Sequence, residues 1–296
     1  MKSGSAPGPA PRTDLPSKLT GPVHGRRVPA LTPPNPPGKA IAMTSALASL
    51  RADPTLGALR RSLDVYYGDA TRDAAMDRLY ARFVTAGDLA FDIGSHVGDR
   101  IGAFRRLGVR VVALEPQPDC ARVIRAVYAG DADVALVEAA CGPNPGTLTL
   151  HINSTNPTVT TASPEFVKAA DGAGGWEGQV WDRQIAVPVT TLDHLIATHG
   201  LPAFVKIDVE GFEADVLAGL SKPVAALSFE FTTIQRDVAI RCLEVLAKLG
   251  AYQFDVAMGE SQVLTFDRWI SGDDMVAHLT GLPHAANSGD VYAKRM

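Results

Sequence analysis

The sequence predicts an α/β protein built on a doubly wound, mostly parallel sheet with helices on both faces. Short apolar runs alternate with segments whose apolar residues recur at helical spacing. Most of the apolar runs lack the polar alternation of a half-exposed strand, which indicates strands that are buried on both faces. Buried strands separated by helical crossovers are typical of a parallel sheet with helices on either side.

The expected strands and helices alternate along most of the chain. The expected strands are 89–94, 110–116, 134–142, 147–152, 203–211, 225–231, 252–258 and 289–295. The expected helices of this part are 97–108, 118–130, 190–200, 212–220 and 235–250. Residues 153–183 and 259–288 do not fit this alternation, and loops of such length are usually functional or disordered. We expect both to shape a substrate pocket. Trp176 and Trp181 in the first loop either contact a ligand or partner, or pack on their own domain.

The composition divides the chain into three parts. Residues 1–42 are basic and rich in proline, and we expect them to be disordered. Residues 43–87 show helical patterns, and residues 88–296 form the α/β domain. The first part has six basic residues against Asp14, so the total charge of −4 leaves −9 on the rest. This acidic balance argues against a nucleic-acid partner, whose phosphates favour basic surfaces.

Several features indicate a cytoplasmic protein without a membrane span. No apolar run approaches the roughly 18 residues that a spanning helix needs. The N-terminus lacks the apolar stretch of a signal peptide. The cysteines are widely separated in apolar surroundings, so we expect free, reduced core residues, which are Cys120, Cys141 and Cys242. No pattern in the sequence indicates an oligomeric state.

A glycine turn follows the first expected strand in the sequence DIGSHVG, residues 92–98. Gly94 allows a tight turn and lets a ligand approach the backbone, and Gly98 lets the following helix begin against the turn. Their spacing differs from the G-x-G-x-x-G pattern that binds nicotinamide dinucleotides. Asp92 would repel a pyrophosphate but would suit a cationic ligand. Glu115 ends the second strand, where it can accept both ribose hydroxyls of an adenosine. Together these residues predict S-adenosylmethionine, which has an ammonium, a sulfonium and a ribose.

A second group of acids lies in VKIDVEGFEADVLAGL, residues 205–220. Asp208 and Glu210 leave a buried strand and precede a helix, where acids complement the helix dipole or face a ligand. Lys206 lies two residues before Asp208, so strand alternation puts both on one face. Glu230 ends the next strand at the same edge of the sheet.

These motifs resemble the FkbM family of S-adenosylmethionine-dependent methyltransferases. The resemblance rests on FDIGSHVGD, VVALEPQPD, VEAACG and above all VKIDVEGFEADVL, and it covers residues 88–293. It implies a seven-stranded Rossmann-like methyltransferase sheet whose last strand is antiparallel. It also implies O-methylation of a hydroxyl on a sugar or natural-product acceptor.

The resemblance further implies how the cofactor is held. The methionine part would lie among Asp92, Gly94, Ser95 and Gly98. Glu115 would bind the ribose, and Ala140 and Cys141 would border the adenine. His96 belongs to the same turn, and we expect it to shape the cofactor site rather than to act in catalysis.

Methyl transfer to an alcohol requires the loss of a proton, so a base is expected. We expect Asp208 or Glu210 to accept this proton or to hydrogen-bond the acceptor. Magnesium prefers hard oxygen ligands and could be held by Asp208, Glu210 and Glu230, although the motifs do not demand it and we predict no metal.

Two other classes remain as alternatives. One is a binding module that keeps the S-adenosylmethionine fold without catalysis, and the other is a nicotinamide-dependent oxidoreductase. The glycine spacing speaks against the oxidoreductase. Asp208 and Glu210 beside the glycine turn speak against the inert module. The expected partner is therefore a small-molecule or glycan acceptor.

Overall fold

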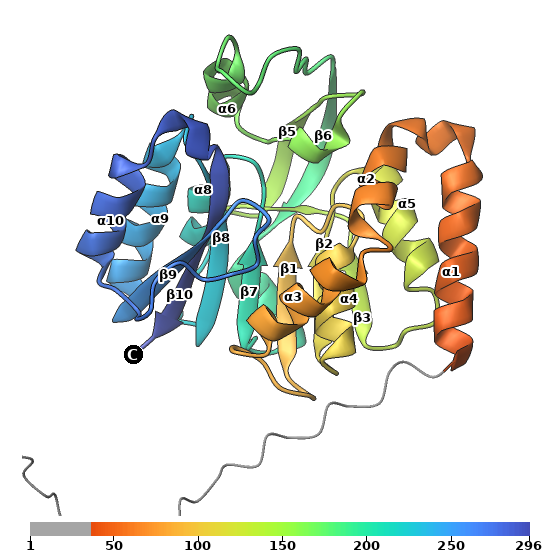
Figure 1. The fold of residues 1–296 in the computed structure, drawn as a ribbon, viewed down its shortest axis with the longest axis horizontal. Helices are drawn as coiled ribbons and strands as arrows, with labels where there is room; N and C mark the ends of the chain where they lie inside the picture. The colour runs from red at the N-terminus through yellow and green to blue at the C-terminus, as the bar shows by residue number, and fades with distance from the viewer. Residues whose placement is uncertain (1–36) are drawn as a thin grey trace, which may run out of the picture. The chain divides into compact units, whose positions relative to one another are not determined.

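A computed structural model describes residues 37–296, which are organised around a seven-stranded sheet (Figure 1). Its strands are β1 (Leu89–Ile93), β2 (Arg110–Leu114), β3 (Val134–Val137), β7 (Phe204–Ile207), β8 (Ala226–Thr232), β9 (Tyr252–Met258) and β10 (Ser288–Arg295). The strand order is β3-β2-β1-β7-β8-β10-β9. The first five strands in this order pair in parallel, whereas β10 is antiparallel to both of its neighbours. The predicted fold class, with its antiparallel last strand, is confirmed.

Helices cover both faces of this sheet. The helices of this sheet after β1 are α4 (Asp99–Arg106), α5 (Pro118–Val127), α7 (Leu192–His199), α8 (Glu213–Ala218), α9 (Arg236–Leu249) and α10 (Gly272–Gly281). The short helix α6 (Pro164–Ala170) belongs to the segment 153–183 and lies apart from this sheet (Figure 1). Phe91 and Ile93 of β1 enter a core with α7, α8, α9 and α10. Ala90 enters the opposite core, with α4. Because successive strand residues point to opposite faces, two apolar cores explain why β1 is buried along its whole length.

The helical N-terminal segment begins earlier than expected. It comprises α1 (Pro37–Ala52), the 3-10 helix η1 (Pro54–Leu59), α2 (Arg60–Tyr66) and α3 (Ala70–Tyr80). The start of α1 lies inside the stretch 1–42, for which disorder is expected, and the expectation for residues 1–36 lies outside the described residues. None of the described helices is both long and apolar enough to cross a bilayer.

A second, three-stranded sheet has the order β4-β6-β5. Its strands are β4 (Ala140–Cys141), β5 (Gly146–Ile152) and β6 (Arg183–Thr190). The run 134–142, expected to be one strand, is divided between β3 in the large sheet and β4 in the small one. No strand is expected at β6, where Pro188 removes a backbone donor and hides the pattern. Pairing with β5 nevertheless orders β6.

The loop 153–183 is ordered by its own side chains. It contains the 3-10 helix η2 (Pro157–Val159) and α6, and a further 3-10 helix, η3 (His284–Ala286), precedes β10. The rings of Trp176 and Trp181 meet Phe166 nearly at right angles, with centroids 5.2 and 6.1 Å away. Trp181 Nε1 also donates to the carbonyl oxygen of Val159 at 2.8 Å. Of the two alternatives, the tryptophans therefore pack on their own domain.

We expect Phe204→Ala to lower the free energy of unfolding by about 3–5 kcal/mol, measured by urea unfolding. Phe204 is fully buried in β7, and its ring lies near Tyr80 of α3 and Phe104 of α4. The matched control is Val65→Ala at a half-exposed position of α2, with a change within about 0.5 kcal/mol. Equal effects of both substitutions would contradict the packing of the N-terminal helices against the sheet.

Candidate functional site

Two parallel strands bring the glycine turn and Glu115 to one edge of the sheet. Ile93 at the end of β1 pairs with Leu114 at the end of β2. The backbone N–H groups of Gly94 and Ser95 both donate to the carbonyl oxygen of Leu114, at 3.0 and 2.9 Å. The turn therefore begins directly beside Glu115, at the carboxyl end of the strands, where open α/β sheets bind ligands.

The two glycines are required by contacts within the protein. Gly94 has φ 83°, and a Cβ atom there would lie 1.9 Å from the carbonyl oxygen of Asp208. The positive φ fits the expected tight turn, and the contact with Asp208 is a second reason for glycine at this position. Gly98 has φ 89° and is the N-cap of α4, with a Cβ position 2.9 Å from the ring of Tyr128.

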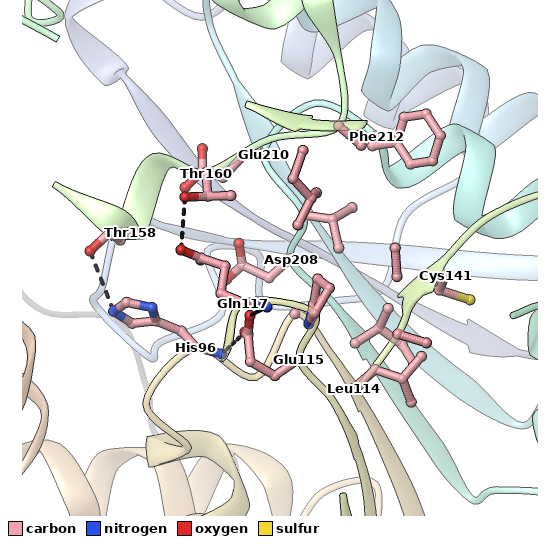
Figure 2. Close-up of a pocket in the computed structure, with 18 residues that line it drawn as sticks. His96, Leu114, Glu115, Gln117, Cys141, Thr158, Thr160, Asp208, Glu210 and Phe212 are labelled. Carbon is pink, nitrogen blue, oxygen red and sulfur yellow. Dashed lines mark hydrogen bonds between the residues drawn. The ribbon is translucent and has the colours of Figure 1, made fainter. Parts of the chain in front are cut away.

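Glu115 is held rigidly in the wall of a cavity. Its side chain is buried, with Oε2 accepting the His96 backbone N–H at 2.7 Å and Oε1 accepting that of Gln117 at 2.8 Å (Figure 2). Burial raises the pKa of Glu115 to about 8, although the two N–H groups act in the opposite direction. Each carboxylate oxygen has a second lone pair, so the group can still accept hydrogen bonds from a ligand.

The His96 side chain is neutral at neutral pH, because burial lowers its pKa to about 4. Its Nε2 lies 3.5 Å from Thr158 Oγ1, and its ring meets Tyr66 edge to face at 6.0 Å. His96 itself has φ 48°, a left-handed conformation that turns its N–H toward Glu115. The residue therefore shapes the turn and carries no charge there.

Beside Glu115 lies a mainly apolar cavity. Its lining comprises Ile93, Gly94, His96, Leu114, Glu115, Pro116, Gln117, Ala139, Ala140, Cys141, Leu150, Thr158, Thr160, Ala162, Asp208, Val209, Glu210 and Phe212 (Figure 2). Seven of the sequence-predicted residues meet here: Gly94, His96, Glu115, Ala140, Cys141, Asp208 and Glu210. Thr158 and Thr160 come from the loop 153–183, and the sequence motifs did not reveal them. We call this the apolar cavity.

A second cavity, which we call the acidic cavity, shares five residues with the first. Its lining comprises Tyr66, Asp92, Gly94, Ser95, His96, Asp99, Arg100, Thr158, Lys206, Asp208, Glu210, Glu230 and Glu260. Asp92 and Ser95, two further residues predicted from the sequence, thus lie at the same cleft. Gly98 lines neither cavity.

Asp92 has a buried oxygen that lacks a partner. The residue is 1% exposed, and no described residue hydrogen-bonds its Oδ2. Burial and the nearby Asp99 raise the pKa of Asp92 to about 7. An unpartnered buried carboxylate is costly, so its position in the cavity wall indicates a cationic or proton-donating ligand.

Lys206 orients Asp208. Its Nζ lies 3.0 Å from Asp208 Oδ2 and 2.7 Å from Asp290 Oδ1, and the side chain is almost completely buried. Although burial disfavours the charge, these two carboxylates hold the pKa of Lys206 well above its ordinary value. The lysine and Asp208 share one face of the strand, as the alternation predicts.

Glu213 is a positioning residue that the sequence did not single out. It is buried, and its carboxylate accepts the backbone N–H groups of Val209 and Gly211, both at 3.1 Å. These bonds stabilise the turn in which Glu210 has φ 55°. In the sequence Glu213 resembles an ordinary acid of the first helical turn, and only its spacing after Glu210 could have revealed the role.

An ion-pair network closes one side of the acidic cavity. Arg72 and Arg100 each contact both Asp99 and Glu260, at 2.7–3.1 Å. Against the effect of burial, Arg100 and Arg72 lower the pKa of Glu260 to about 2. Arg72 also lies over the ring of Tyr66. The insert 259–288 therefore contributes to the cavity wall through Glu260.

The fold and the cleft at its carboxyl edge are those of an α/β methyltransferase. Residues 92–256 match the model of the methyltransferase FkbM domain, and the chain belongs to this family. S-adenosylmethionine is its cofactor. The unpartnered Asp92 oxygen and the buried Glu115 carboxylate beside an apolar wall fit the charged and ribose parts of that molecule.

Solved structures similar to this chain include three methyltransferases. An O-methyltransferase from Bacillus cereus in complex with SAH is 11% identical, with 88% of this chain and 92% of that one covered, at a TM-score of 0.42. A TehB-like SAM-dependent methyltransferase from Corynebacterium glutamicum is 10% identical, with coverages of 80% and 94% and a TM-score of 0.41. A precorrin-6y C5,15-methyltransferase from Geobacter metallireducens is 15% identical, with coverages of 77% and 90% and a TM-score of 0.39. None of the curated proteins matches the chain.

Replacing Glu115 by Gln is expected to flatten the pH dependence of stability. The folded chain holds the Glu115 proton up to about pH 8, against an ordinary pKa of 4.5. The folded state therefore binds more protons in this window, and stability falls as the pH rises through it, by at most about 5 kcal/mol. The Glu115→Gln variant has no titrating group at this position, so its stability should change less over the same pH range. Urea unfolding across the window measures both slopes, and identical slopes would contradict the raised pKa.

Proposed function

We propose that the chain transfers a methyl group from S-adenosylmethionine to a hydroxyl oxygen of a sugar or natural-product acceptor. One observation carries the proposal: the apolar cavity beside Glu115 shares residues with the acidic cavity that contains Asp92 and Asp208. A long ligand with an apolar base, a ribose and a cationic end can span both. The acids at the far end are then placed to meet the acceptor.

In this proposal each part of the cofactor has its own residues. Glu115 binds the ribose hydroxyls through its remaining lone pairs. Ala140 and Cys141 of β4 border the adenine, and their burial in the apolar cavity supports this role. The methionine part lies near the glycine turn, among Asp92, Gly94, Ser95 and His96, while Gly98 lines neither cavity and instead packs against Tyr128. Of these Asp92 has the free oxygen that suits an ammonium group.

Asp208 and Glu210 are the proposed catalytic residues. The cofactor supplies a methyl group on a sulfonium, whose carbon–sulfur bond breaks as the carbon–oxygen bond to the acceptor forms. Asp208 or Glu210 takes the proton that leaves the acceptor hydroxyl. Lys206 holds Asp208 in place, and Glu213 holds the turn of Glu210. Such positioning of the reacting groups can supply about 7–11 kcal/mol of the barrier reduction.

Charge and cysteine chemistry support a small-molecule acceptor and a cytoplasmic location in this proposal. Residues 43–296 carry a net charge of −9, which is unsuited to nucleic acid. The three cysteines are free and buried, as they are in proteins of reducing compartments.

Calorimetry is expected to show binding of S-adenosylhomocysteine and no binding of NADH to the wild-type chain. Glu115→Ala removes the hydrogen-bonding carboxyl group that is proposed to bind the ribose, so affinity should fall about 10–100-fold. Glu244→Gln, an exposed substitution on α9, is the matched control and should bind normally. Binding of NADH alone would favour the oxidoreductase alternative.

We expect Asp208→Asn to reduce methyl transfer about 100-fold or more, because it removes a general base. Transfer is measured with methyl-labelled cofactor and an extract of small molecules as acceptors. Binding of S-adenosylhomocysteine should remain within a few-fold of wild type, which separates catalysis from cofactor binding. Unchanged transfer in the variant would exclude Asp208 as the base.

A further inference from the structure

Three carboxylates meet in the acidic cavity. Asp208 and Glu210 follow β7, and Glu230 belongs to the neighbouring parallel strand β8. One oxygen atom from each residue lies within 4.8 Å of the other two. The Oε2 atom of Glu230 is buried, and no described residue hydrogen-bonds it.

The described basic residues do not pair with all of the acids that line the acidic cavity. Arg72 and Arg100 pair with Asp99 and Glu260, and Lys206 pairs with Asp208 and Asp290 in the manner already described. The remaining acids that line the cavity are Asp92, Glu210 and Glu230. No ion pair joins these three to any basic group in residues 37–296.

Asp92 provides an observation independent of the cluster. It lies on β1, is 1% exposed, and lines the same cavity with an oxygen that no described residue bonds. S-adenosylmethionine carries two positive groups and one carboxylate, so it contributes one net positive charge. If Asp92 takes the ammonium, the charges of Glu210 and Glu230 still have no counterion.

We propose that Asp208, Glu210 and Glu230 bind a divalent cation, Mg²⁺ or Mn²⁺, next to the methyl donor. Oxygen ligands are the ones these ions prefer, and opposite ligands of an octahedral Mg²⁺ lie about 4.2 Å apart. The three oxygen atoms are therefore within a small side-chain movement of a coordination shell. An open position of this ion would hold the acceptor oxygen. This role rests on the proposed methyl transfer, whereas the cation site itself does not.

The test uses Mn²⁺ alone with the full chain, before any acceptor is known. Calorimetry and the electron paramagnetic resonance signal of free Mn²⁺ should both give one site per chain. Glu230→Gln and Glu210→Gln should each weaken Mn²⁺ binding at least about 10-fold, since each removes a charged ligand. The control Glu244→Gln should bind Mn²⁺ like the wild type. Circular dichroism identifies a variant that fails to fold, and the other variant then decides.

The outcomes separate this inference from the proposed function. No Mn²⁺ binding by the wild type, or unchanged binding in both folded variants, overturns the cation site. If the wild type binds S-adenosylhomocysteine but does not bind Mn²⁺, the cation site is excluded and the proposed methyl transfer is unaffected. If the wild type binds Mn²⁺ but not S-adenosylhomocysteine, the cation site is supported and the proposed methyl transfer is contradicted. Loss of S-adenosylhomocysteine binding in Glu230→Gln, with no Mn²⁺ bound by the wild type, would assign the cluster to the cofactor's ammonium and overturn the inference.

Discussion

The contact between the glycine turn and the loop after β7 sets the geometry of the whole cleft. β1 and β7 are parallel neighbours, and the N–H of Asp208 donates to the carbonyl oxygen of Ile93 at 2.9 Å. The carbonyl oxygen of Asp208 then fills the space where any side chain at Gly94 would begin. The glycine turn is therefore in direct backbone contact with the segment that carries Asp208 and Glu210. A side chain at position 94 would force the two apart, and the residues that depend on both would lose their alignment.

Buried charge is the second constraint on the cleft. Some of its buried acids are paired with basic residues, and others are not. Lys206 compensates Asp208 and Asp290, and the two arginines compensate the acids at the cavity edge. Elsewhere in the cleft, carboxylates are hydrogen-bonded by backbone N–H groups, as Glu115 and Glu213 are, or have no partner among the described residues, as Asp92 Oδ2 does. The unpartnered oxygen of Asp92 lines the acidic cavity, which is where the proposed cationic ligand would lie.

The parts of the site that the sequence reveals are those attached to strand ends. Glu115 and Asp208 each follow a strand directly, and in a parallel sheet these ends share an edge. Tyr66 and Thr158 could not be found in this way, because they reach the cleft from a distant helix and an irregular loop. The same holds for the fold, because the buried strands of the large sheet could be predicted from continuous apolar runs in the sequence. The division of 134–142 between two sheets depends on tertiary pairing, which no local pattern encodes.

Two residues that line the acidic cavity, Tyr66 and Glu260, lie outside the region that matches the family model, and so does Arg72, which pairs with Glu260. Residues 92–256 thus contain every residue that is proposed to hold the methyl donor, while flanking segments complete the lining of the acidic cavity. Substitutions in those flanks can therefore reshape the acidic cavity, next to Asp208 and Glu210, without changing the residues that are proposed to hold the donor.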